Sequence, residues 1–157
     1  MKFTFKQRFF SLTDKYDVRD EAGNLVYTAK RGFFFRRRLR IYDKDKNQVG
    51  AIKAKFFAFL PTYKIYVGKE CVGKIKKKFS FFKPKFAMDC KGWKIKGGFF
   101  EMKYSIVDSE GTTVATVARK LLRLTTTYTM DVVNPEDALH ALMVVLAITS
   151  EKASRKK

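Results

Sequence analysis

Two runs of lysine and arginine, each interleaved with phenylalanine, have the side chains that could bind an anionic ligand. In the first run no acidic residue lies between Glu21 and Asp43, and Phe33, Phe34 and Phe35 stand beside the arginines. Arginine binds phosphate through two parallel hydrogen bonds, whereas phenylalanine contacts a membrane interface or stacks on bases. The cations of this run are Lys30, Arg31, Arg36, Arg37, Arg38 and Arg40.

The second run contains no acidic residue between positions 71 and 88. Successive side chains of a strand point to opposite faces, so Lys74, Lys76 and Lys78 are expected to share one face. Such a stripe of ammonium groups suits a membrane plane or a phosphate backbone. The cations of this run are Lys74, Lys76, Lys77, Lys78, Lys83 and Lys85.

An ordinary structural interpretation remains open for both runs. Alternate phenylalanines would then fill the core, the cations would be solvated, and the lysines would discourage pairing at a sheet edge. A third basic and aromatic stretch, residues 53–61, could be a loop tip that dips into lipid, but it is more typical of a buried strand.

Catalytic chemistry has little support in the sequence. Most acidic residues fall in expected turns, and one histidine with two separated cysteines, Cys71 and Cys90, supplies no nucleophile and base pair. The common motifs of hydrolases, metalloproteases and nucleotide-binding enzymes are absent from the sequence. We therefore expect no enzymatic activity, no cofactor and no metal site, and we expect His140 to be a core residue.

The composition indicates a globular protein with an anionic partner. Lysine and arginine number 34 against 15 acidic residues, which gives a net charge of +19, and 46% of the residues are hydrophobic. That charge attracts nucleic acid, anionic lipid or acidic protein, whereas the apolar content is too high for a disordered polycation. With two cysteines expected to be reduced and buried, and no apolar targeting segment at the start, we expect a cytoplasmic protein without a transmembrane helix.

A recurring pattern of strand, polar turn and strand predicts the fold. Clear copies span residues 16–27, 39–52, 63–75 and 104–117, and a degenerate fifth copy spans residues 86–98. Asp, Asn and Gly favour tight turns, and the flanking residues alternate with a period of two, as in β-hairpins. We therefore expect an antiparallel meander of ten to twelve strands that closes on itself or is covered.

The pattern ends at a predicted helix. Asn134 is a favourable cap, Pro135 suits the first helical turn, and Glu136 and Asp137 favour its positive end. Residues 138–148 are apolar nearly all round, which predicts burial on every side, inside the sheet. We expect one domain over residues 1–150 and a flexible basic tail over residues 151–157.

This order of parts resembles the LURP-one-related family of the tubby C-terminal-like superfamily, which includes the phospholipid scramblases. The matching stretches are residues 6–12, the Tyr-x-Val/Ile-x-Asp-x-x-Gly hairpins, residues 93–97, and the strand around Tyr128 that leads to the apolar helix. The resemblance implies a closed antiparallel barrel of about twelve strands around a central C-terminal helix. Tubby domains of this superfamily bind phosphoinositide headgroups through basic residues, so the resemblance favours a phospholipid as the ligand.

The leading functional hypothesis is a non-enzymatic module that binds anionic phospholipid headgroups at a membrane surface through the two basic runs. Two alternatives stay open. The same cations would bind nucleic acid, with Phe33, Phe34 and Phe35 as stacking platforms. The third class is a structural or regulatory protein with an acidic protein partner, for which the charge steers encounter.

Overall fold

The computed structural model describes residues 1–8, 15–31, 38–57, 60–78, 85–97 and 102–155. Twelve strands precede a short 3₁₀ helix, η1, and one α-helix, α1. The elements are β1 (Lys2–Arg8), β2 (Lys15–Arg19), β3 (Leu25–Arg31), β4 (Arg38–Asp43), β5 (Gln48–Phe57), β6 (Leu60–Val67), β7 (Glu70–Lys78), β8 (Lys85–Asp89), β9 (Lys94–Lys96), β10 (Lys103–Val107), β11 (Thr113–Leu121), β12 (Thr125–Val132), η1 (Pro135–Asp137) and α1 (Ala138–Arg155).

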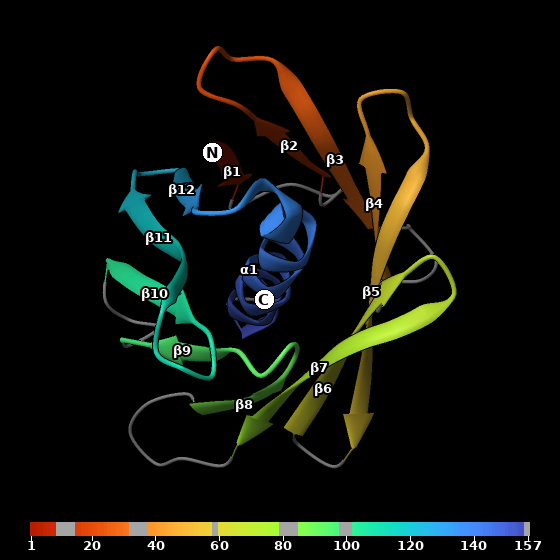
Figure 1. Ribbon diagram of the computed structural model, residues 1–157. Coiled ribbons are helices and arrows are strands. Elements are labelled where there is room, and N and C mark those ends of the chain that lie inside the picture. Colours follow the sequence, from red (N-terminus) through yellow and green to blue (C-terminus); the bar gives the residue numbers. More distant parts are fainter. Residues whose placement is uncertain (9–14, 32–37, 58–59, 79–84, 98–101, 156–157) are drawn as a thin grey trace.

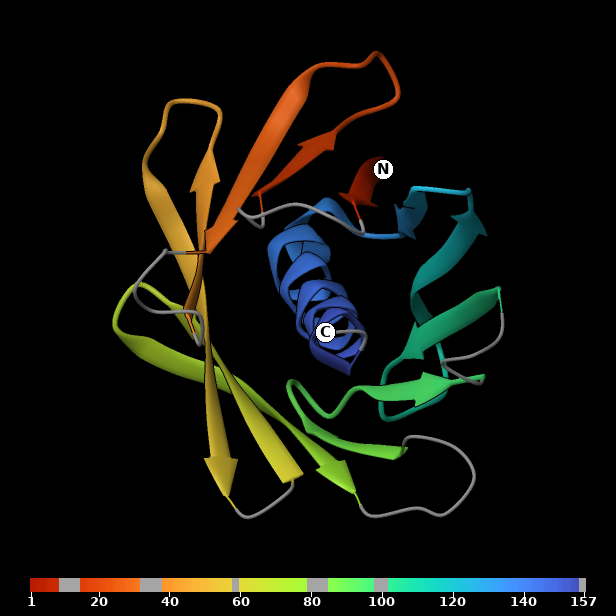
Figure 2. The ribbon, with the colours of Figure 1, turned by 180° about the vertical axis from the view of Figure 1, so that it is seen from behind.

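All twelve strands belong to one antiparallel sheet that curls around α1 (Figure 1). Because β1 pairs with both β2 and β12, the two ends of the strand sequence lie side by side, and β8 and β9 form the sheet edges. Seen from behind, the strands surround the helix (Figure 2). The prediction of an antiparallel barrel of about twelve strands around a C-terminal helix is therefore confirmed, and the barrel is nearly rather than fully closed, because β8 and β9 remain as edges.

Aspartate side chains fix three of the four clear hairpin turns. One carboxylate oxygen of Asp43 accepts hydrogen bonds from the backbone N–H groups of Asp45 and Asn47, and Asp108 binds Glu110 and Thr112 in the same way. Asp20 accepts a bond from the Asn24 N–H. These contacts satisfy backbone donors that the strands leave free, so the predicted hairpins over residues 16–27, 39–52 and 104–117 are confirmed, as is the one over 63–75.

The fifth predicted hairpin, over residues 86–98, is wrong. Its two strands, β8 and β9, do not pair with each other in the described sheet. The connecting turn carries Cys90 rather than an aspartate cap, and both Cys90 and Trp93 are buried, so this turn directs side chains into the core between the two edges. The cysteines are free, but Cys71 is exposed, which corrects the expectation that both thiols are buried.

The helix forms the centre of the core. Residues 141–149 are all buried, and Met143 lies so close to Gly50 of β5 that a β-carbon there would lie 2.8 Å from the methionine sulfur. Asn134 has extended backbone angles, as a cap requires, but its side chain makes no capping hydrogen bond, so the turn relies on its carbonyl, which accepts the Asp137 N–H. Helical backbone continues through Arg155, into the segment expected to be a tail.

The antiparallel order gives the barrel two distinct ends. We call the end that holds Met1, the three aspartate turns and η1 the turn end. The other end, which we call the loop end, holds the strand termini Arg8, Lys15, Arg31, Arg38 and Lys78, and also the β11–β12 connection. Helix α1 follows η1 directly, so it starts at the turn end. Its eighteen residues span about 27 Å and run toward the loop end.

Candidate anion-binding site

Alternation along the strands places the predicted cations on the outer side of the barrel. On β7, Lys74, Lys76 and Lys78 are exposed, while Ile75 between them is fully buried. The period of two in this run therefore places the three ammonium groups on one face, as predicted. On β4, Arg40 likewise faces outward between the buried Leu39 and Ile41.

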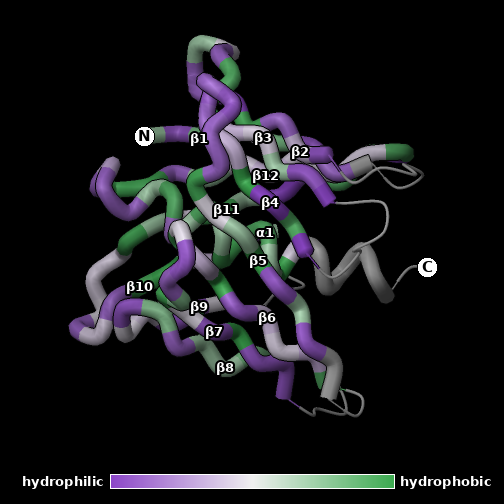
Figure 3. Tube along the Cα trace, turned by 90° about the vertical axis from the view of Figure 1, so that its right-hand side faces the viewer, coloured by the Kyte–Doolittle hydropathy of each residue, from purple (hydrophilic) through white to green (hydrophobic). Residues whose placement is uncertain are grey.

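Strand register brings the two basic runs together. Arg38 of β4 is opposite Lys53 of β5, Lys53 is opposite Lys64 of β6, and Lys64 is opposite Lys74 of β7. Neighbouring strands lie about 5 Å apart, so four cations stand in a row across four strands. We call the outer surface of β3 to β7 the basic face (Figure 3), and its cations are Lys30, Arg38, Arg40, Lys53, Lys55, Lys64, Lys74, Lys76 and Lys78.

Of the remaining predicted site residues, the structure describes the side chains of two. Arg31 and Lys77 are half-buried, and they alternate to the inward side of their strands. The side chain of Lys85 and the whole of Arg36, Arg37, Lys83, Phe33, Phe34 and Phe35 lie outside the described residues. The structure thus unites six of the predicted cations, which are Lys30, Arg38, Arg40, Lys74, Lys76 and Lys78.

Sequence reasoning missed the lysines that connect the two runs. Lys53 and Lys55 belong to the stretch interpreted as buried strand, yet Lys53 is half-exposed and Lys55 is exposed. The signal was present, because Lys53 and Lys55 alternate with Ile52 and Ala54, the pattern of a strand with one face in solvent. Only the register shows that Lys64 fills the gap between them and β7.

Two tyrosines lie among the cations of the basic face. The Lys53 ammonium lies 4.5 Å from the centre of the Tyr66 ring, and the Lys30 ammonium lies 5.7 Å from that of Tyr42. An ammonium over a ring face is attracted by the ring quadrupole. Among the described residues, no ion pair is formed by Lys53, Lys64, Lys74 or Lys76, although Asp89 of β8 is opposite Lys74 in the sheet.

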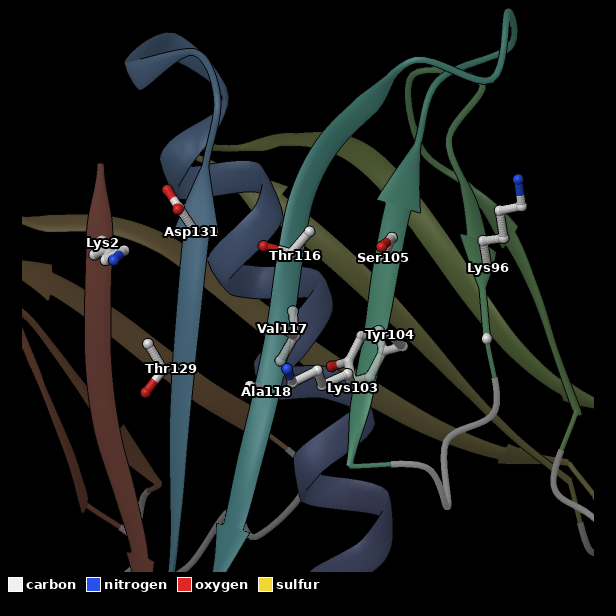
Figure 4. A pocket seen from close by; sticks show the side chains of 11 residues that line it. Lys2, Lys96, Lys103, Tyr104, Ser105, Thr116, Val117, Ala118, Thr129 and Asp131 are labelled. Atoms are coloured by element: carbon white, nitrogen blue, oxygen red, sulfur yellow. The ribbon is translucent and has the colours of Figure 1, made fainter.

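A second polar surface lies on the other side of the barrel, over β1 and β9 to β12. It is an open groove of about 570 Å³ (Figure 4), and its lining also includes backbone next to the core residues Tyr104 and Val117, whose side chains are buried. Ser105, Thr116 and Thr129 supply hydroxyl groups, and the rim lysines are Lys2, Lys96 and Lys103. The carboxylate of Asp131, 3.6 Å from the N-terminal amine, also lies in the groove, so its charge is mixed and it suits an anion less than the basic face does.

Polar side chains inside the barrel are structural. The Tyr128 hydroxyl donates a hydrogen bond to Gln7 Oε1 at 3.3 Å, and the Tyr128 ring stacks on Phe5. Burial raises the pKa of Tyr104 and of Tyr128, and burial likewise raises the pKa of the Cys90 thiol. These groups therefore stay protonated near neutral pH, and Tyr128 acts as a hydrogen-bond donor in that form.

A barrel of twelve antiparallel strands, closed around an apolar C-terminal helix and basic on one outer face, defines the class of this protein. The family model of LURP-one-related proteins matches residues 1–150, and the chain belongs to this family. The chain is also similar to an uncharacterized protein, YxjI of Bacillus subtilis (strain 168), with 26% identity over 144 residues that cover 91% of this chain and 88% of the relative.

A solved structure shares the fold. The X-ray structure of a protein from Arabidopsis thaliana matches with a TM-score of 0.59 and 13% sequence identity, over 98% of this chain and 91% of that one. Identity this low carries the fold and nothing about the ligand. Among the residues that the structure describes, no helix has the length and apolar character needed to cross a membrane.

Proposed function

We propose that this protein is a non-enzymatic module that binds anionic phospholipid headgroups peripherally, through its basic face. The observation that carries the proposal is the row Arg38, Lys53, Lys64 and Lys74, four cations in register on neighbouring strands. Each basic residue near an anionic membrane contributes about 1 kcal/mol, so a face with nine cations is sufficient for firm, salt-sensitive attachment.

The cost of this row argues against a purely structural role. Like charges directly opposite each other on neighbouring strands destabilise a sheet. Lysines that discourage pairing belong on edge strands, but the edges here are β8 and β9, whereas β5 and β6 are paired on both sides. An anionic surface would relieve the repulsion among these cations. Binding to such a surface therefore explains the row, whereas protection of a sheet edge does not.

The aromatic residues of the basic face favour lipid over nucleic acid. Single-stranded nucleic acid binds by stacking its bases on free aromatic faces. Tyr42 and Tyr66 are half-buried, and lysine ammonium groups lie over both rings. They are therefore poor stacking platforms, while the ammonium groups remain available to phosphate.

Co-sedimentation with liposomes tests the proposal. The purified protein is mixed with neutral vesicles, with vesicles that contain phosphatidylserine or a phosphoinositide, and with the latter plus single-stranded RNA, across a salt series. We expect binding to the anionic vesicles alone, decreasing with salt and resisting equimolar RNA. Binding absent at physiological salt would contradict the proposal, and displacement by stoichiometric RNA would make nucleic acid the ligand.

Charge reversal assigns the binding to the basic face. The variant Lys53→Glu, Lys64→Glu, Lys74→Glu should lose vesicle binding. The matched control reverses three exposed lysines at the turn end, Lys44, Lys69 and Lys94, and changes the net charge by the same amount. Equal losses in the two variants would mean that net charge, rather than this face, attracts the membrane.

A further inference from the structure

The connection between β11 and β12 exposes apolar side chains at the loop end. Leu121, Leu122 and Leu124 are 51%, 47% and 60% exposed, and Met102, beside Arg119 of β11, is 46% exposed. Single exposed leucines are ordinary, but a contiguous apolar group marks an interaction surface. We call Leu121, Leu122 and Leu124 the leucine tip.

The backbone holds the leucine tip in place. The Leu122 N–H donates to the Thr125 carbonyl at 2.8 Å, and the Arg119 N–H donates to the Met102 carbonyl at 2.8 Å. Lys120 and Arg123 are exposed within the same segment. The tip therefore combines fixed leucines with flanking cations, the composition of segments that enter the boundary between headgroups and acyl chains.

The distribution of charge along the barrel sets the direction of approach. Nearly all described carboxylates lie at the turn end, namely Asp20, Glu21, Asp43, Asp45, Glu70, Asp89, Asp108, Glu110, Asp131, Glu136 and Asp137. Asp17, in the middle of β2, is flanked by Lys15 and Arg19 at 3.6 and 3.9 Å. Described cations at the loop end include Lys15, Arg38, Lys55, Lys78, Lys120 and Arg123. The field of the protein thus presents the loop end to a negative surface.

We propose that the leucine tip inserts into an anionic phospholipid bilayer, with the loop end facing the membrane and the turn end facing away. This inference rests on the proposed function and adds the depth and orientation of binding. The leucines would enter the acyl boundary while Lys120 and Arg123 stay at the headgroups, because long cationic side chains keep their charged ends in water. On the basic face, the cations nearest the bilayer would be Arg38, Lys55, Lys76 and Lys78.

A second copy of the chain is the competing occupant of the tip. Pairing two tips would bring together two loop ends of the same positive sign in molecules of net charge +19. Like-charge surfaces repel, whereas an anionic bilayer satisfies both the leucines and the cations. The charge therefore favours the membrane.

Fluorescence quenching by lipids brominated on their acyl chains tests the insertion. A tryptophan is placed at Leu124, and the matched control places one at Ala22, which is exposed in the β2–β3 turn at the turn end. Trp93 is 4% exposed and serves as a buried reference in both variants. On anionic vesicles we expect the emission of Leu124→Trp to shift to the blue and to be quenched, and that of Ala22→Trp to stay unchanged.

A binding measurement completes the test. Leu122→Ser with Leu124→Ser should weaken binding to anionic vesicles at least about tenfold while leaving thermal unfolding unchanged, because both side chains are solvated in the free protein. If the wild-type protein binds no anionic vesicles, both the proposed function and the proposed insertion are contradicted. Binding without quenching at Leu124 would overturn the insertion alone. A wild-type dimer in light scattering that the serine variant abolishes would also overturn it and assign the tip to self-association.

Discussion

The two ends of the barrel are built by opposite chemistry on the same strands. At the turn end, carboxylates form local contacts. Asp43 and Asp108 each accept two backbone hydrogen bonds, and Asp137 pairs with Lys91 at 3.2 Å. Acidic residues there are close in sequence to the cations Lys44, Lys69 and Lys91. At the loop end, the strand termini Lys15, Arg38 and Lys78 are cationic, and leucines of the β11–β12 connection are exposed.

This contrast separates stability from binding. Both ends enclose the same helix and share the same inward-facing core. The core therefore does not require the two ends to differ in charge. Residues at the turn end close hairpins and should affect folding, whereas residues at the loop end carry an excess of described cations and exposed apolar area and should affect binding. Each prediction below changes one end of the barrel.

The largest expected effect comes from charge reversal near the loop end. Lys55→Glu with Lys78→Glu alters two exposed cations on β5 and β7. At about 1 kcal/mol per basic residue, removing their attraction costs about 2 kcal/mol of membrane binding, roughly 30-fold, and the new negative charges increase that loss. Titration with phosphatidylserine vesicles measures the affinity.

The control for this variant lies at the other end. Lys44→Glu with Lys69→Glu changes the net charge equally, in turns that we place away from the membrane. We expect a loss several-fold smaller than that of the loop-end variant. If the turn-end variant lost as much, the barrel would not approach the membrane by its loop end.

A smaller effect, on folding, is expected from the turn end. Asp108→Ala removes the acceptor for the N–H groups of Glu110 and Thr112, at 3.0 and 2.9 Å. The free energy of unfolding should fall by about 1 kcal/mol, with no loss of vesicle binding. Urea unfolding measures the first and co-sedimentation the second. The neighbouring Glu110→Ala should change stability by less than about 0.5 kcal/mol, and equal effects would mean that the carboxylate bonds of Asp108 do not hold the turn.

The barrel could be predicted because its signals are local. Aspartate turns and the alternation of apolar residues specify each hairpin, and an apolar stretch such as residues 138–148 has to be enclosed. The fifth hairpin failed because a turn looks the same whether or not its strands pair. Cys90 and Trp93, between β8 and β9, are buried, and this burial depends on tertiary packing that a local sequence pattern does not show.

The candidate site could be predicted only in part. Runs such as Lys74 to Lys78 are visible in the sequence, but a row across strands depends on register, which brings together Lys53, Lys64 and Lys74 from separate hairpins. Alternation also turns Arg31 and Lys77 inward, and composition does not reveal this. The leucine tip has no charge pattern to single it out, and its exposure follows from its position at the end of the β11–β12 pair.

The smallest expected effect concerns His140, near the turn end of α1. His140 is half-buried, its Nδ1 atom has no hydrogen-bond partner among the described residues, and its ring forms a T-shaped pair with Trp93, with ring centres 6.5 Å apart. Burial lowers the pKa of His140 below its usual value of about 6.5, the charge of Lys91 lowers it further, and Asp137 opposes the shift.

The direction of the pH dependence follows from that lowered pKa. Above about pH 6.5 the imidazole is neutral in both the folded and the unfolded chain; as the pH falls, the unfolded chain takes up the proton first. The folded state should therefore lose stability from about pH 6.5 down to the lowered pKa. His140→Gln should remove this loss, and comparing the urea midpoints of the two proteins at pH 7.5 and 5.0 cancels the titration of the carboxylates. If the two proteins lost equal stability, His140 would titrate as it does in water. If the variant instead changed vesicle binding at pH 7.5, the turn end would have a part in binding, and the division between the two ends would fail.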